Sequence, residues 1–292
     1  MIERTQALQH IRRLHIKALH NVEDLFSGFY RSAFKGKGLE FEDVREYFPG
    51  DDIRTIDWNV TARSQHPFVK NFREERELTV MLIVDLSASS GFSHLNRLKS
   101  DIIAELAAIL AFSAIKNQDK VGLLLFTNEI ELYLTPKKGV RHVLRVIREL
   151  LYFIPRNKGT DLSKALSFLA KVQAKHAICF LISDFLSDGF SKEAALIAKR
   201  HELIAFHVYD TYEETCIPRG LFHLRDLETA EEAFIDTDDV KIREQFEKKS
   251  RQKALKTRHL FSSIGADYLS IHTGEASNDV LQRFFKLRRR RT

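Results

Sequence analysis

The sequence predicts an α/β protein with a doubly wound, mostly parallel sheet. Buried strands are expected at 78–86, 121–126 and 177–183, where consecutive residues are apolar and rich in Val, Ile and Leu. Segments of about 10 to 20 residues with helical periodicity separate these runs. Strands that alternate with helices in this way pair in parallel, with helices on both faces of the sheet.

Taken in order, residues 1–25 are predicted to form an N-terminal helix, because apolar residues recur at spacings of three and four. Glycine and aromatic residues punctuate residues 26–76, which we interpret as a small β-rich extension of strands and turns. The sheet domain is expected over residues 77–275. Residues 276–292 are predicted to form a C-terminal helix with a basic tail.

Within the sheet domain, the remaining segments complete the alternation. A strand is expected at 130–134 as a hairpin partner at the sheet edge, and others at 203–209 and 267–272. An insertion at about 210–264 begins with irregular chain, extended at 234–236, and ends in a charged helix. The helices are predicted at 96–116, 140–151, 161–174, 192–201, 240–264 and 278–287.

Composition places the chain among globular proteins. It has 292 residues, of which 44% are hydrophobic and 29% charged. The net charge of +6 comes largely from five basic residues near the end, Lys286 and Arg288–Arg291. Because the rest of the chain is almost neutral, nucleic-acid binding is not expected. We interpret the terminal arginines as a solvated tail, with peripheral contact to an anionic membrane or contact to nucleic acid as the alternatives.

Cysteine usage and hydropathy indicate a reduced, cytoplasmic protein. Cys179 and Cys216 form no C-x-x-C motif and lie away from clustered histidines, which argues against a disulfide scaffold or a zinc site. The longest apolar run, about residues 102–115, is shorter than the ~20 residues that cross a bilayer, and Glu105 interrupts it. The first residues carry charges and no apolar stretch, so no signal peptide is expected.

Polar residues follow the buried strands where a parallel sheet gathers its ligands. Asp85 ends the first strand and is followed by Ser87 and Ser89, whose alternation directs their oxygens to one side. Asp184 follows the third strand, and Thr160 lies in a Gly-Thr-Asp turn that opens a helix. The carboxyl ends of parallel strands meet at one edge of the sheet. Two carboxylates and three hydroxyls favour a hard divalent cation, Mg²⁺ or Mn²⁺, or Ca²⁺ in a looser site.

Each of these residues also has a purely structural interpretation. Ser87 or Ser89 is suited to cap the following helix, and Thr160 is suited to cap the helix at 161–174. We favour the metal site because all three segments come to the same edge of the sheet. Such a set leaves a coordination position open, where a carboxylate from another molecule can bind.

The pattern resembles the metal-ion-dependent adhesion site (MIDAS) of von Willebrand factor A-type domains. Asp-x-Ser-x-Ser after the first strand, Gly-Thr before a helix and Ser-Asp after a buried strand match all five ligand positions. The resemblance covers about residues 77–275. It implies a module that binds other proteins through the metal.

A charged and aromatic segment precedes the sheet domain. Its Pro49-Gly50-Asp51-Asp52 stretch is predicted to form a turn. Aspartates interleave with arginines here, so bidentate arginine–carboxylate pairs are expected to hold the irregular chain in a fixed shape. Such a network serves either as a structural device or as a partner surface. The residues concerned are Arg45, Tyr47, Gly50, Asp51, Asp52, Arg54, Asp57, Trp58 and Arg63.

The string Gly50-Asp51-Asp52-x-Arg54-x-Ile56-Asp57-Trp58, just before an A-type domain, closely resembles the signature of the bacterial family named domain of unknown function fifty-eight. Nearly the whole chain fits, including 225–229 and 235–237. Ser90 departs from the pattern, since relatives usually carry Met there, but it lies outside the ligand set. The resemblance implies a partnership with a MoxR-type AAA+ ATPase in chaperone-like remodelling or maturation of other proteins.

Two functions remain open from the sequence. The first is a metal-dependent interaction module, an adaptor or co-chaperone of the ATPase and possible binder of its clients, with no catalytic residues and no small-molecule substrate. The second is a metal-dependent phosphoester hydrolase. A hydrolase needs a base or nucleophile, and Asp161 and Asp188 are the loop carboxylates available near that edge. We prefer the first function because the ligand set has no evident nucleophile or base beside it.

Overall fold

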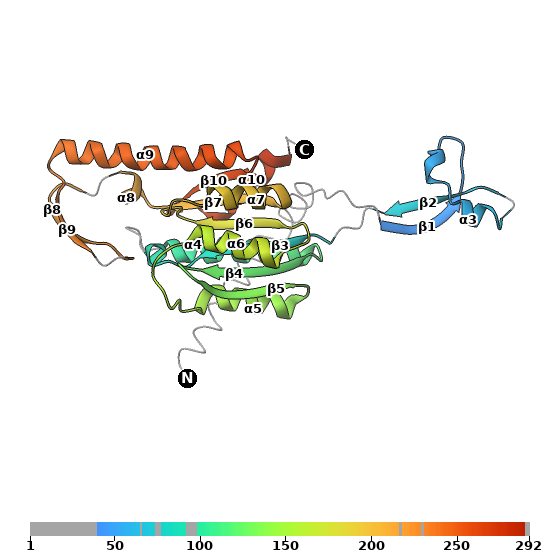
Figure 1. Cartoon of the computed structure of the whole chain (residues 1–292), viewed down its shortest axis with the longest axis horizontal. Coiled ribbons are helices and arrows are strands. Elements are labelled where there is room, and N and C mark those ends of the chain that lie inside the picture. Colours follow the sequence, from blue (N-terminus) through green and yellow to red (C-terminus); the bar gives the residue numbers. More distant parts are fainter. Residues whose placement is uncertain are drawn as a thin grey trace. The chain divides into compact units, whose positions relative to one another are not determined.

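The computed structural model describes residues 40–64, 66–73, 77–91, 98–215, 218–228 and 231–289. The helix predicted at 1–25, Cys216 and the last three residues of the basic tail lie outside these ranges. The chain divides into a small unit, Phe34–Leu78, and a larger unit that contains Thr79–Thr292 (Figure 1). Each unit is described by itself.

The larger unit is built on a six-stranded sheet with the order β10-β7-β6-β3-β4-β5. Five strands run parallel and the edge strand β5 runs antiparallel to β4, which confirms the doubly wound, mostly parallel fold. The chain leaves the central β3 toward β4 and later returns to its other side as β6. The strands are β3 (Thr79–Asp85), β4 (Lys120–Phe126), β5 (Ile130–Lys137), β6 (Ile178–Ser183), β7 (Glu202–Tyr209) and β10 (Asp267–His272).

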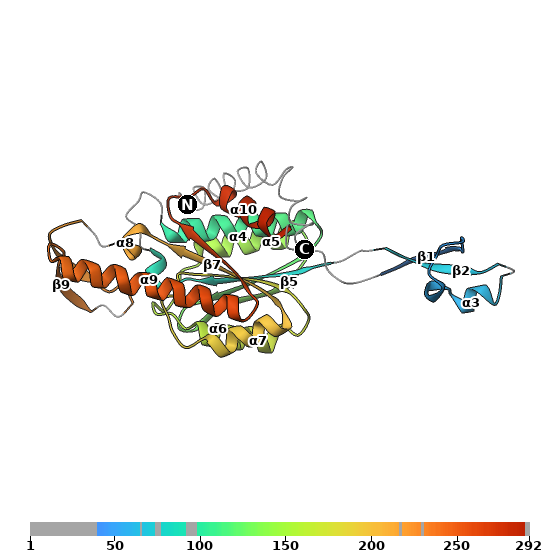
Figure 2. The same cartoon turned by 90° about the horizontal axis from the view of Figure 1, so that it is seen from above.

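Helices cover both faces of this sheet. One face carries α4 (Lys99–Lys116), α5 (Val140–Tyr152) and α10 (Ser277–Arg289), and the other carries α6 (Leu162–Val172) and α7 (Ser191–Arg200) (Figure 2). The long helix α9 (Val240–Ser263) contacts β10 and the short helix α8 (Thr211–Glu214). No helix in the described ranges is long and apolar enough to cross a membrane.

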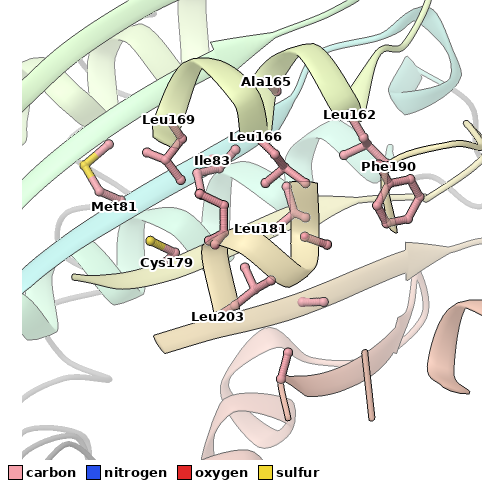
Figure 3. Close-up of a cluster of buried hydrophobic side chains, with 14 of the residues drawn as sticks. Met81, Ile83, Leu162, Ala165, Leu166, Leu169, Cys179, Leu181, Phe190 and Leu203 are labelled. Carbon is pink, nitrogen blue, oxygen red and sulfur yellow. The ribbon is translucent and has the colours of Figure 1, made fainter. Parts of the chain in front are cut away.

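The core forms because the central strands are apolar on both sides. Met81 and Ile83 of β3 pack with Leu166 of α6 and Leu181 of β6 in a fully buried cluster (Figure 3). The alternate residues Val80, Leu82 and Val84 are equally buried. Helix α4 is apolar around most of its circumference, as expected for a helix enclosed by the sheet and its neighbours. These layers fix the carboxyl ends of β3 and β6 beside each other.

The insertion differs from its predicted irregular form. It contains α8 and a two-stranded antiparallel hairpin, β8 (Leu221–Arg225) and β9 (Glu232–Asp236), before α9 begins. The sequence indicated only the second of these strands, at 234–236. The first was missed because Leu221–Arg225 has no clear alternation and both of its strand faces are largely exposed.

The small unit is an antiparallel pair, β1 (Glu40–Glu46) and β2 (Phe68–Arg73), joined by η1 (Ile53–Thr55) and α3 (Trp58–Thr61). The Arg45 guanidinium makes two hydrogen bonds of 2.7 Å with the carboxylate of Asp51, which also accepts the backbone N–H of Phe48 at 2.9 Å. Arg45 thereby lowers the pKa of Asp51 to about 2, and the Phe48 amide contributes.

The other two aspartates of the signature cap short helices. Asp52 accepts the backbone N–H of Arg54 at 3.0 Å and begins η1. Asp57 accepts the N–H groups of Asn59 and Val60 and begins α3. Side-chain caps of this kind satisfy amides that a short helix leaves free. The signature therefore encodes a capped turn-and-helix connection, with one arginine–aspartate pair at its start.

Candidate functional site

Asp85 lies at the carboxyl end of β3, where the chain order of the sheet reverses. Its side chain is fully buried. The hydroxyl of Ser183 donates to one carboxylate oxygen at 2.6 Å, and the backbone N–H of Ser87 donates to the other at 2.9 Å. Ligands of open α/β sheets bind at such a reversal point. One donor is the last residue of β6 and the other follows β3, so this carboxylate is held in a single orientation.

Ser87 lies two residues after Asp85 and immediately before the short helix η2 (Ala88–Gly91), and Ser89 lies within η2. Their hydroxyl oxygens are 3.0 Å apart, and both side chains are buried. Helix α4 begins after Leu98, and neither serine caps it. The capping interpretation of these serines is therefore wrong for the helix that follows.

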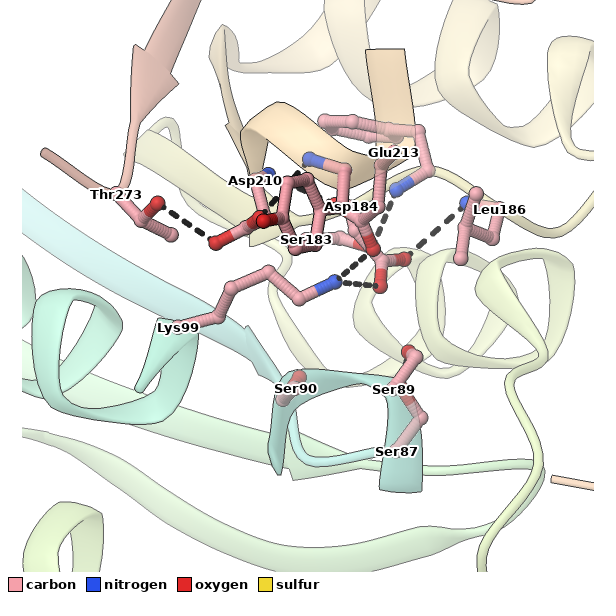
Figure 4. A network of polar contacts seen from close by, with 12 residues as sticks. Ser87, Ser89, Ser90, Lys99, Ser183, Asp184, Leu186, Asp210, Glu213 and Thr273 are labelled. Carbon is pink, nitrogen blue, oxygen red and sulfur yellow. Dashed lines mark hydrogen bonds and ion pairs between the residues drawn. The ribbon is translucent and has the colours of Figure 1, made fainter. Parts of the chain in front are cut away.

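Asp184 is the second carboxylate and follows β6. It accepts the backbone N–H of Leu186 at 3.2 Å and the ammonium of Lys99 at 2.9 Å (Figure 4). Lys99 is fully buried at the start of α4, and it also donates to Glu213 of α8 at 2.6 Å. Asp210 begins α8, and its backbone N–H binds the other oxygen of Glu213 at 2.9 Å. A buried carboxylate–ammonium–carboxylate chain thus adjoins the predicted ligands.

Thr160 lies in the loop before α6. Asp161, not Thr160, caps that helix, since its side chain accepts the N–H of Lys164 at 2.8 Å. The Thr160 hydroxyl is instead directed to Glu228, at 2.9 Å. The same loop is bound to the serine turn, because Ala88 N–H donates to the Lys158 carbonyl at 2.8 Å. The three predicted ligand segments therefore share one edge of the sheet.

Burial sets the charges of the two aspartates. It raises the pKa of Asp85 to about 7, and the nearby charge of Asp184 adds to this effect. Burial also opposes ionisation of Asp184, but the ammonium of Lys99 and a hydrogen bond from Ser89 outweigh it and lower the pKa of Asp184. Within the pair, Asp184 is the ionised partner. The described hydrogen bonds of the buried Asp85 carboxyl group come from Ser183 and from the Ser87 amide, and none comes from a cation.

The residues present fit a hard divalent cation. When all are ionised, Asp85, Asp184 and Glu213 carry three negative charges against the one positive charge of Lys99. A divalent cation would offset two of these negative charges. In an octahedral Mg²⁺ site with metal–oxygen distances of ~2.1 Å, neighbouring ligand oxygens lie about 3 Å apart. The Ser87–Ser89 oxygen separation of 3.0 Å agrees with that spacing.

The donor set consists of oxygens alone. No cluster of three or more His, Cys, Asp or Glu side chains suited to a metal occurs in the ranges that the structure describes. The predicted set has two carboxylates, and its other three members are hydroxyls. Such a set excludes the soft thiolate and imidazole chemistry of structural zinc sites.

The carboxylates considered for hydrolysis are placed elsewhere. Asp161 is engaged as the cap of α6. Asp188 is 79% exposed and lies 3.8 Å from the ammonium of Lys256. Neither carboxylate contacts Asp85 or Asp184 through a described hydrogen bond. Neither carboxylate is therefore placed as a general base beside the two aspartates.

An apolar pocket of about 560 Å³ begins at Asp184 and was not predicted. Its walls come from the loop after β6, from β7, α8 and α9, and from the β8–β9 hairpin, and they include Phe185, Tyr209, Tyr212 and Phe246. Burial lowers the pKa of His207, which also lines it, to about 4. Residues from five elements far apart in sequence form this pocket, so no local pattern could have indicated it.

The signature residues lie in the small unit. Gly50 has φ +115° in the predicted turn, a backbone conformation that favours glycine. Tyr47 N–H donates to the Pro67 carbonyl at 2.9 Å, which joins the two ends of the connection. Trp58 is 67% exposed, and Phe48 and Ile53 are similarly exposed. Arg54 and Arg63 are exposed as well. The unit therefore presents apolar and cationic side chains together.

Known proteins resemble this chain over most of its length. An uncharacterized protein of Mycobacterium tuberculosis is 27% identical over 283 residues, covering 96% of this chain and 89% of that protein. An aerotolerance-related membrane protein from Bacteroides fragilis has a similar fold, with a TM-score of 0.50 and 14% identity, covering 74% of this chain and 100% of that one. A von Willebrand factor type A structure from Catenulispora acidiphila matches with a TM-score of 0.43 and 10% identity, over 73% of this chain and 42% of that one.

The model of the family described as "Protein of unknown function DUF58" matches residues 43–256. This range includes most of the signature segment, the predicted ligands and most of the insertion. It confirms the family that the signature string indicated: the chain belongs to the DUF58 family.

Proposed function

We propose that this protein is a metal-dependent protein–protein interaction module. Mg²⁺ is the favoured ion, with Mn²⁺ or Ca²⁺ as substitutes, and its ligands are Asp85, Ser87, Ser89, Thr160 and Asp184. The observation that carries the proposal is the charge imbalance at the end of β3. A buried carboxylate with a raised pKa lies beside a second carboxylate that is already ionised, with hydroxyls at ligand spacing.

The metal would supply an electrophilic position that accepts a carboxylate from a partner. The chain's own residues would orient it: Ser183 and the Ser87 amide fix Asp85, and Lys99 fixes Asp184. Charge-assisted contacts in a dry setting are strong and directional. Binding of this kind depends on the metal and on an acidic side chain of the partner.

We propose a MoxR-type AAA+ ATPase as the partner, with the cytoplasm as the place of action. Membership of the DUF58 family supports this partner, because the resemblance to that family implies a partnership with a MoxR-type ATPase. The exposed apolar residues Phe48, Ile53 and Trp58 support a second contact surface on the small unit. Remodelling or maturation of other proteins is the role that follows from such a partnership.

We further propose a binding role rather than a hydrolytic one. Support comes from the positions of Asp161 and Asp188, of which one caps a helix and the other lies exposed beside Lys256. The check is release of p-nitrophenol from p-nitrophenyl phosphate in Mg²⁺ and in Mn²⁺. Turnover that is lost in Asp85→Asn and kept in Asp188→Asn would reverse this proposal.

The metal site is tested by calorimetric titration of the metal-free protein with Mg²⁺ and Mn²⁺. Wild type and the exposed control Asp188→Asn should bind one equivalent. Asp85→Asn should bind at least tenfold more weakly, because it loses a charged ligand at nearly constant shape. Equal binding by Asp85→Asn would place the metal elsewhere.

The partnership is tested by pull-down of the purified MoxR-type ATPase in Mg²⁺ and in EDTA. Retention in Mg²⁺ alone, and loss with Asp85→Asn, would support binding through the metal. Retention of the ATPase under all of these conditions would show that the interface does not involve the metal. In that case Trp58→Ala, with Ile154→Ala of the larger unit as an exposed apolar control, tests the small unit.

A further inference from the structure

A carboxylate of this chain already lies against the predicted metal ligands. The Thr160 hydroxyl donates to one oxygen of Glu228 at 2.9 Å. A Cβ atom on the neighbouring Gly159 would lie 3.8 Å from the other oxygen. Glu228 therefore rests with its whole carboxylate on the loop that carries Thr160. The two residues are 68 positions apart, so a folded element must deliver Glu228 to this loop.

The β8–β9 hairpin of the insertion brings Glu228 to the Thr160 loop. Glu228 lies in the connection between the strands, where its backbone N–H donates to the Asp226 side chain at 2.8 Å. The Asp226 N–H bonds the Glu231 carbonyl at 2.8 Å across the same connection. At the base of the hairpin, Thr237 donates to the Gly220 carbonyl at 2.8 Å. Both ends of the hairpin are thus fastened, and its tip holds Glu228.

The distance between the Thr160 and Glu228 oxygens can also be compared with the spacing of ligand oxygens around a metal. Their oxygens are 2.9 Å apart, close to the spacing of about 3 Å between neighbouring ligand oxygens of an octahedral Mg²⁺ site. A direct hydrogen bond in the metal-free state and shared ligation in the metal-bound state need almost the same geometry. The Thr160–Glu228 pair can therefore keep its spacing, but Glu228 must move toward Asp85 and Asp184 when the metal binds, because the described residues contain no group of three acidic side chains that could hold a metal.

We infer that Glu228 is an internal ligand of the metal site, occupying the position that a partner's carboxylate would take. This inference rests on the proposed function, since it requires the metal. A tethered group competes at an effective concentration on the order of millimolar. A partner present at lower concentration must therefore displace Glu228, either through additional contacts or by moving the hairpin. The insertion keeps the site occupied until such a partner binds.

The experiment uses Mn²⁺ and the full chain, with Glu228→Ala as the variant. The control is Glu232→Ala on the same hairpin, whose side chain pairs with His223 at 3.1 Å. Mn²⁺ affinity is measured by calorimetry, and water bound to the ion by water-proton relaxation. Loss of Glu228 should weaken Mn²⁺ binding about tenfold and increase the relaxation enhancement, because water fills the vacated position.

Acetate provides the competing carboxylate. At millimolar concentration it should reduce the relaxation enhancement of Glu228→Ala and leave wild type and Glu232→Ala unchanged. Amide hydrogen exchange gives a readout independent of affinity. Mn²⁺ should slow exchange over 221–236 in wild type and not in Glu228→Ala.

The outcomes separate the two proposals. If wild type binds Mn²⁺ and Glu228→Ala matches it in affinity, hydration and acetate response, the internal-ligand inference is wrong and the metal site stands. If wild type binds no Mn²⁺, both are wrong. A Glu232→Ala variant that behaves like Glu228→Ala would assign the effect to hairpin folding and would also overturn the inference.

Discussion

Burial strongly alters the acid–base chemistry of Asp85. In solution its carboxyl group would ionise near pH 4, but in the folded chain burial and Asp184 raise its pKa to about 7. A group whose pKa rises on folding holds its proton more tightly in the native state. The metal-free protein therefore loses stability as the pH increases from about 4 to about 7.

Asp85→Asn should remove this pH dependence. We expect the variant to be more stable than wild type at pH 8 in EDTA, and nearly equal to it at pH 4, where Asp85 is protonated. Each pKa unit corresponds to roughly 1.4 kcal/mol, so the difference at pH 8 amounts to several kcal/mol. Urea denaturation across this pH range measures it. A variant less stable than wild type at pH 8 would show that Asp85 is stabilised as the carboxylate.

Lys99 is the residue on which the neighbouring carboxylates depend. It is fully buried between Asp184 and Glu213. Lys99→Met should cost about 3–5 kcal/mol, because it leaves two buried carboxylates without their cation. Lys116→Met, at the exposed end of the same helix, is the control. Urea denaturation at neutral pH distinguishes them, and equal stabilities would mean that Glu213 and Asp184 are solvated without Lys99.

Two short elements bring distant side chains to the end of the sheet. Helix α8 positions Glu213 through a reciprocal cap with Asp210. The β8–β9 hairpin positions Glu228 beside Thr160. Neither element contributes a fully buried apolar residue, so each is held by polar contacts and by its neighbours. The rigid sheet supplies the aspartates, and the insertion supplies the groups around them.

Strand β4 carries Gly122 between its two neighbouring strands, β3 and β5. A Cβ on Gly122 would lie 2.4 Å from Met81 Sδ, 2.9 Å from the Pro136 ring and 3.1 Å from the Leu134 carbonyl. The thioether can move, but the ring and the backbone cannot do so freely. Gly122→Ala should therefore destabilise the larger unit by about 1–3 kcal/mol through overpacking. Gly91→Ala, with no atom within 4 Å, is the control in thermal denaturation. Equal melting temperatures would show that the strands separate at little cost.

For the protein as a whole, metal binding should increase the free energy of unfolding and raise Tm. An ion that binds only the folded chain stabilises it by about 2.7 kcal/mol at a hundredfold excess over Kd. For a unit of this size that raises Tm by roughly 5–10 °C. Thermal denaturation in Mg²⁺ and in EDTA tests this expectation. Asp188→Asn should show the same shift as wild type, and Asp85→Asn at most about half of it, because its binding is at least tenfold weaker. A full shift in Asp85→Asn would indicate another site.

Much of the fold could be predicted from local patterns. The runs at 78–86, 121–126 and 177–183 are β3, β4 and β6, because a strand buried on both faces must be apolar at every position. The positions of Asp85 and Asp184 follow from the same fact, since polar residues begin where such strands end. Asp51, Asp52 and Asp57 were predicted to pair with arginines, yet Asp52 and Asp57 cap short helices. Both roles use the same residue types, so sequence alone does not separate them.

From the sequence alone one can predict which segments are buried strands, where those strands end, and which oxygen-bearing side chains follow them. The tertiary structure decided which charges accompany those oxygens. Lys99 reaches Asp184 across 85 residues, and Glu228 reaches Thr160 across 68. Local periodicity reports the environment of a side chain along its own element, whereas these contacts depend on how separate elements pack. The predicted ligands can therefore be read from the sequence, but the contacts of Asp184 with Lys99 and of Thr160 with Glu228 arise only in the folded chain.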